Sequence, residues 1–71
     1  MANLESPLAG KIFEINIEVG QAVNEDDEVI VIDAMKMENP VYCPVTGTVK
    51  EIKVKIGDQV NEGDVLAVIE E

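Results

Sequence analysis

Apolar and polar residues alternate along two stretches of the chain, residues 13–19 and 52–56. The alternating apolar residues are Phe13, Ile15, Ile17 and Val19 in the first stretch and Ile52, Val54 and Ile56 in the second. A period of two is typical of a strand with one face in a core and the other in water. Short β-branched runs at Val29–Ile32 and Val65–Ile69 also favour strands. No stretch has the 3.6-residue period of a helix, so the pattern predicts an all-β fold.

The chain contains an internal repeat. Residues 7–34 align with residues 44–71 without a gap, at a constant offset of 44 − 7 = 37. Eleven of the aligned pairs are identical. Each copy has a Gly after its alternating stretch and then a polar segment, Asn24–Asp27 or Asn61–Asp64, which predicts a turn. Two copies of one β-unit predict a small flattened barrel or sandwich with a pseudo-twofold axis.

The repeat also predicts where the chain ends lie. The segment Met35–Cys43 bridges the two copies, and the equivalent position of the other copy falls at the chain ends. The two termini should therefore lie together at one end of the domain, with the bridge projecting from the opposite end.

Composition excludes several kinds of function. Fifteen Asp or Glu face five Lys, with no Arg and no His, and the net charge is −10. Without His there is no imidazole base, and without Arg no bidentate clamp for phosphate. The negative charge opposes binding to nucleic acid or to an anionic membrane. The 71 residues thus predict one non-catalytic domain with no nucleic-acid or membrane contact.

The single cysteine, Cys43, aligns with Ser6, and each precedes a proline. This parity predicts a small structural position rather than a reactive thiol. One cysteine cannot form an internal disulfide, so we expect a cytoplasmic protein.

The bridge carries the candidate chemistry. Met35 and Met37 flank Lys36, and the turn between the two strands would ordinarily favour Asn-Gly or Asp-Gly. A departure from local turn rules marks a possible functional site. The alternative interpretation is an ordinary exposed loop lysine, with two methionines that fill gaps in the core.

The sequence Ala34-Met35-Lys36-Met37 resembles the biotin attachment motif of biotin carboxyl carrier proteins, commonly Glu-Ala-Met-Lys-Met. Further matches are Pro7 with Gly10, Pro44 with Gly47, and Gly57 with residues 61–64. The resemblance covers residues 1–71 and implies one biotinyl domain. Its expected fold is a barrel-sandwich hybrid, a flattened barrel of two four-stranded antiparallel sheets with a protruding hairpin at residues 35–37. Asp33 stands where Glu is usual, and no thumb insertion is present. These features suit either a free-standing carrier or a domain of a larger carboxylase.

The resemblance implies a function for this hairpin. A biotin protein ligase would join biotin to Lys36 through an amide, using biotinyl-adenylate, and would recognise Ala34, Met35 and Met37. Biotin would then carry a carboxyl group from a biotin carboxylase to a carboxyltransferase or decarboxylase, as in acyl-CoA carboxylases. The other lysines, Lys11, Lys50, Lys53 and Lys55, should stay unmodified.

Two alternatives share this fold. One is a lipoyl carrier of a 2-oxo-acid dehydrogenase or of the glycine cleavage system, in which Asp-Lys-Ala usually surrounds the lysine. Methionine on both sides of Lys36 argues against it. The other is an unmodified barrel-sandwich interaction module, whose function would not change if Lys36 were substituted.

Overall fold

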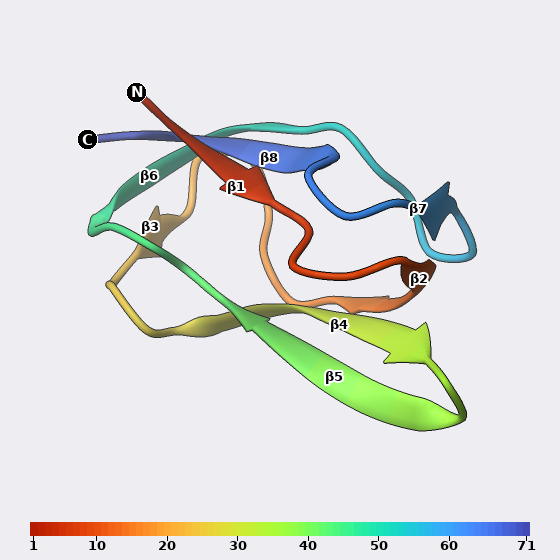
Figure 1. Ribbon diagram of the computed structural model, residues 1–71. Helices are drawn as coiled ribbons and strands as arrows, with labels where there is room; N and C mark the ends of the chain where they lie inside the picture. The colour runs from red at the N-terminus through yellow and green to blue at the C-terminus, as the bar shows by residue number, and fades with distance from the viewer.

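The computed structural model describes residues 1–71 and contains eight β-strands and no helix (Figure 1). The strands are β1 (Ala2–Glu5), β2 (Gly10–Ile15), β3 (Ala22–Val23), β4 (Glu28–Ala34), β5 (Met37–Tyr42), β6 (Gly47–Ile52), β7 (Gln59–Val60) and β8 (Val65–Glu70). They form a terminal sheet with the order β1-β8-β6-β3 and a hairpin sheet with the order β5-β4-β2-β7. All pairs are antiparallel, so the predicted all-β fold of two four-stranded sheets is confirmed. No helix that could span a membrane is present.

The two sheets repeat each other pair for pair at the 37-residue offset of the sequence repeat. Lys11 pairs with Asp33 in the hairpin sheet as Thr48 pairs with Glu70 in the terminal sheet. The offset also relates β5 to β1, although residues 1–6 and 38–43 share no identical residue. The pseudo-twofold symmetry therefore includes segments in which the sequence shows no repeat.

The core lies between the two sheets and is almost entirely aliphatic. Fifteen buried residues form one cluster, in which the largest side chains are those of Ile, Leu and Val. Burying one such side chain contributes about 1.5–3 kcal/mol, so a few residues from each strand hold the sheets together. Neither aromatic side chain belongs to this cluster.

The predicted alternation of residues 13–19 is wrong at both of its ends. Ile12 and Glu14 pair with adjacent residues of β4, so Phe13 is the extra residue of a β-bulge and is exposed. At the other end, Val19 lies beyond β2 and is exposed, as is its counterpart Ile56. A bulge shifts the inward-facing phase by one residue, which a period-two pattern cannot reveal.

Both polar turns form where the sequence predicts them, and with matching hydrogen bonds. The backbone N–H of Asn24 donates to Asp27 Oδ2 at 2.9 Å, and that of Asn61 donates to Asp64 Oδ2 at 2.8 Å. Asp26 has a φ of 73°, and its counterpart Gly63 has a φ of 90°. A side-chain oxygen that accepts from a nearby backbone N–H stabilises such turns.

Cys43 and Ser6 occupy equivalent buried positions, as the sequence predicts. The Cys43 thiol donates to the carbonyl oxygen of Val45 at 3.0 Å, and the Ser6 hydroxyl donates to that of Leu8 at 2.6 Å. Only 1% of Cys43 is exposed, so its role is structural.

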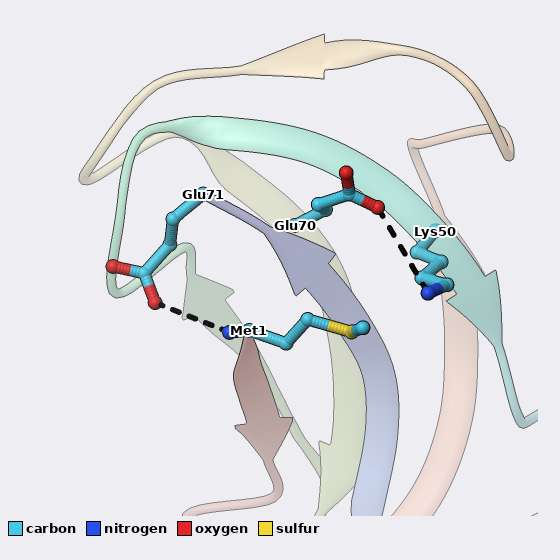
Figure 2. Close-up of polar contacts among 4 residues, drawn as sticks. All are labelled: Met1, Lys50, Glu70 and Glu71. Carbon is cyan, nitrogen blue, oxygen red and sulfur yellow. Dashed lines mark ion pairs between the residues drawn. The ribbon is translucent and has the colours of Figure 1, made fainter.

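The two termini lie together, at the end of the domain opposite the β4–β5 turn (Figure 1). β1 and β8 are neighbouring antiparallel strands, and the Met1 amino group lies 3.9 Å from Glu71 Oε1 (Figure 2). The domain is elongated, with principal extents of 32 × 18 × 18 Å. The predicted separation of the bridge from the chain ends is therefore observed.

Candidate functional site

The turn between β4 and β5 is a two-residue turn, Met35-Lys36, closed by the Ala34–Met37 pair. Both turn residues have positive φ, 53° for Met35 and 63° for Lys36. Positive φ at both central positions is the feature of a type I′ turn, for which Asn-Gly is preferred. A residue with a Cβ costs about 1–2 kcal/mol in this conformation. The Met-Lys pair therefore holds backbone strain at the tip of the hairpin.

The tip of the hairpin extends past the rest of its sheet. β2 pairs with β4 only as far as Asp33, which also pairs with Glu38 on β5. Ala34, the turn and Met37 lie beyond this last three-stranded row, and the turn projects from the domain (Figure 1). Lys36 thus lies at the tip of the hairpin, beyond the last paired residues of the sheet.

Lys36 and both flanking methionines are exposed. Met35 is 93% exposed and Met37 65%, so neither fills a gap in the core. Lys36 is exposed and takes part in none of the three ion pairs of the structure. Exposed apolar side chains on both sides of a lysine offer a partner protein an apolar contact next to the amine.

Ala34, a predicted recognition residue, is placed differently. Only 7% of Ala34 is exposed, and it belongs to the core cluster. Its methyl group lies over Gly10, where an added Cβ would be 3.0 Å from Ala34 Cβ and 2.6 Å from Ile32 Cγ2. The side chain of Ala34 therefore packs the base of the hairpin and offers a partner little surface.

Asn39, which no sequence motif indicates, connects the two strands of the hairpin. Its side-chain amide donates to the carbonyl oxygens of Met37 at 3.1 Å, Ile32 at 3.4 Å and Ala34 at 3.5 Å. Its counterpart at the other end of the domain is Ala2, so the repeated fold does not need an amide here. That difference between the two copies was the signal that could have identified Asn39.

Acidic side chains surround the base of the hairpin. Asp33 and Glu38 face each other across β4 and β5, and both are exposed. Lys11 lies on the other side of Asp33 and supplies the only positive charge in this row. Like charges directly opposite each other are unfavourable in a sheet, so this pair is not explained by the stability of the hairpin.

The geometry fits the covalent attachment of a group to Lys36. Such a site needs an accessible amine on a rigid support, and the hairpin supplies both. The structure has no pocket and no cluster of three or more His, Cys, Asp or Glu side chains that could hold a metal ion. The residues with candidate chemistry, Met35, Lys36 and Met37, are exposed at the tip of the hairpin.

Comparison with known proteins gives a consistent result. The biotin/lipoyl family, described as "Biotin-requiring enzyme", matches residues 2–69. The gamma subunit of methylmalonyl-CoA decarboxylase from Veillonella parvula is 34% identical over 41 residues, which are 58% of this chain and 32% of the subunit.

Two solved structures contain a similar domain. The Kluyveromyces lactis urea carboxylase superposes with a TM-score of 0.91 and 39% identity, over 97% of this chain and 6% of that one. A single-chain, multi-domain long-chain acyl-CoA carboxylase superposes with a TM-score of 0.87 and 27% identity, over 93% of this chain and 7% of that one. The chain thus spans about a third of the curated relative and less than a tenth of each carboxylase chain. It belongs to the biotin/lipoyl family and is a carrier domain homologous to the biotinyl domains of carboxylases.

Proposed function

We propose that this chain is a biotin carboxyl carrier whose attachment residue is Lys36. The observation that carries the proposal is the exposed lysine in a strained turn between two exposed methionines, on the fold of the biotin/lipoyl family. A biotin protein ligase is the partner that joins biotin to the Nζ atom of Lys36 through an amide. Bound biotin supplies a ureido nitrogen that holds a carboxyl group during transfer.

The protein's own residues present the attachment point and take no part in bond making elsewhere. The two-residue turn and the Asn39 amide fix the direction of the lysine, while its four-carbon stem lengthens the arm. Exposed Met35 and Met37 give the ligase an apolar contact on either side of the amine. The same hairpin presents the lysine to every enzyme that the carrier visits.

The partners follow from the function. A biotin carboxylase loads the carboxyl group, and a carboxyltransferase or a decarboxylase takes it. The relatives named for carboxylases and for a decarboxylase support this pair of partners. Holding the group on a tether raises its effective concentration at both active sites. We place this cycle in the cytoplasm, in keeping with the lone buried cysteine.

The experiment is an intact-mass measurement after incubation with ATP, biotin and a biotin protein ligase. A second sample receives lipoate and a lipoate ligase. Lys36→Ala is the control in both, and Lys11→Ala is the matched variant, because Lys11 is another exposed lysine without an ion pair. We expect one biotinyl increment in the unchanged chain and in Lys11→Ala, and none in Lys36→Ala.

The other outcomes separate the alternatives. A lipoyl increment alone would assign the chain to the lipoyl carriers. No increment from either ligase would favour an unmodified interaction module, and an increment that survives Lys36→Ala would move the site to another lysine.

A further inference from the structure

The pseudo-twofold symmetry provides an internal comparison between the outer faces of the two sheets. Each outward position of the hairpin sheet has a counterpart in the terminal sheet with the same backbone pairing. Differences between equivalent positions therefore do not come from the fold. Among the outward pairs that differ, three have the more apolar residue in the hairpin sheet, which is given first here: Phe13 and Lys50, Pro40 and Asn3, and Tyr42 and Glu5. At Glu28 and Val65, and at Glu38 and Met1, the terminal sheet instead has the more apolar residue, so the apolar excess of the hairpin sheet is confined to Phe13, Pro40 and Tyr42.

These residues form a continuous surface, which we call the outer patch: Phe13, Val31, Pro40 and Tyr42. Val31 pairs with Pro40 on one side and with Glu14, the neighbour of Phe13, on the other. Tyr42 follows Pro40 by two residues on the same face of β5, because Val41 between them is buried. Val31 is buried but lies outside the core cluster, so neighbouring outer side chains cover it.

The two aromatic side chains of the outer patch are incompletely covered. Phe13 is 46% exposed and Tyr42 54%, and they are the only aromatic residues of the chain. At the equivalent position of the terminal sheet, Lys50 Nζ instead lies 3.9 Å from Glu70 Oε2, an arrangement typical of a solvated surface (Figure 2). Exposed aromatic side chains that the fold does not require indicate a contact surface.

Acidic residues border the outer patch. Glu14, Glu28, Asp33 and Glu38 are exposed and lie on the same three strands, β2, β4 and β5. These acidic residues disfavour binding of a second copy of the chain, because that copy has the same net charge of −10. It suits a protein surface with an apolar centre and a rim of Lys and Arg.

The position of the outer patch links it to the lysine. β4 and β5 carry both features, and Pro40 follows Lys36 by four residues, a separation of about 14 Å along a strand. A protein that contacts the outer patch therefore lies beside the hairpin. ATP and bicarbonate are both anions, so a positively charged approach to the active site favours their capture by a biotin carboxylase.

We propose that the outer patch is the docking surface for the biotin carboxylase partner, whose basic rim would contact it while the hairpin enters the active site. This inference rests on the proposed function. A small contact suits a carrier that must leave after each transfer.

The test exchanges residues between symmetry-related positions. Phe13→Lys/Tyr42→Glu places on the hairpin sheet the residues that the terminal sheet has, and Lys50→Phe/Glu5→Tyr is the reverse exchange. Both double variants keep the net charge at −10 and use side chains that the fold already accepts at equivalent positions. Each variant is biotinylated, its modification checked by mass, and then titrated into a biotin carboxylase that acts on separate carrier proteins, with ADP release as the assay.

We expect Phe13→Lys/Tyr42→Glu to raise KM for the carrier about tenfold with kcat unchanged, as the loss of two aromatic contacts predicts. Lys50→Phe/Glu5→Tyr should keep the KM of the unchanged chain, and biotinylation should be equally fast in all three. An unchanged KM in Phe13→Lys/Tyr42→Glu, or an equal rise in the reverse exchange, would overturn the docking surface. A fully biotinylated unchanged chain that stimulates no ADP release would instead count against the proposed carrier function.

Discussion

Replacing the two turn residues by the pair that the turn geometry prefers should stabilise the domain. Met35→Asn/Lys36→Gly puts Asn and Gly where the backbone has φ of 53° and 63°. The fold should become more stable while the proposed attachment residue is lost. Stability and function would then be opposed at the same two positions.

The expected gain can be worked from the backbone. Each of the present residues costs about 1–2 kcal/mol in the left-handed conformation. Glycine at position 36 removes the strain there, but the greater freedom of the unfolded chain costs about 0.5–1 kcal/mol. Asn at position 35 removes part of the strain at that position. Little is lost with the replaced side chains, because Met35 is 93% exposed and Lys36 forms no ion pair. The net gain is on the order of 1–2 kcal/mol, or about 7–13 °C in Tm for a domain of this size.

Thermal unfolding followed by circular dichroism, with urea unfolding for the free energy, measures this gain. Met35→Ala/Lys36→Ala is the control, because it removes both long side chains but keeps a Cβ at each strained position. We expect no increase in Tm for the control. A Tm of Met35→Asn/Lys36→Gly at or below that of the unchanged chain would refute the assignment of strain to this turn.

Three further predictions concern residues around the hairpin and the core. Asn39→Ala should lower the kcat/KM of biotinylation several-fold and speed amide hydrogen exchange at the tip, because it removes the bond to the Met37 carbonyl; unchanged exchange would contradict this role. Gly10→Ala should destabilise the fold by about 2 kcal/mol or more in urea unfolding, since its Cβ would lie 2.7 Å from the Asp33 carbonyl oxygen, and a loss below about 0.5 kcal/mol would show that β4 can shift. Cys43→Ser should change stability by less than about 1 kcal/mol, because Ser6 fills the equivalent position; a larger loss would mean that the two sites differ in polarity.

Much of the fold could be predicted from the sequence because the repeat relates one half of the chain to the other. Val29–Ile32 lies within β4 and Val65–Ile69 within β8, and both polar turns form as the aligned Asn and Asp residues indicate. An internal repeat constrains the strand order as well, since the two sheets must be equivalent.

The edge strands and the bulge could not be predicted in this way. β1 and β5 share no identical residue, and Pro40 in β5 is tolerated only because the strand lies at an edge of its sheet. The alternating pattern predicts that Phe13 is buried, whereas the bulge in β2 leaves it exposed. β1 pairs with β8 at the other end of the chain, and the bulge arises where β2 pairs with β4; local patterns encode neither pairing.

The candidate site divides in the same way. The position of Lys36 between Met35 and Met37 was visible in the sequence. The burial of Ala34 and the bonds of Asn39 were not, because both depend on how closely two strands approach at the end of a sheet. The sequence indicates the candidate residue, and the structure shows which side chains surround it.

The placement of the two termini opposite the turn has a further consequence for how far Lys36 can travel. In a longer chain, a linker joined to either end would leave from the pole farthest from the lysine (Figure 1). The folded domain, with its long extent of 32 Å, then acts as a stiff spacer between the end of the linker and the lysine. A stiff spacer adds its whole length to the distance that the lysine can reach. A flexible chain adds an end-to-end distance that grows only as about the square root of its residue number. The swept volume grows as the cube of the lysine's reach, so two active sites can lie well apart with a short linker between the domain and its anchor.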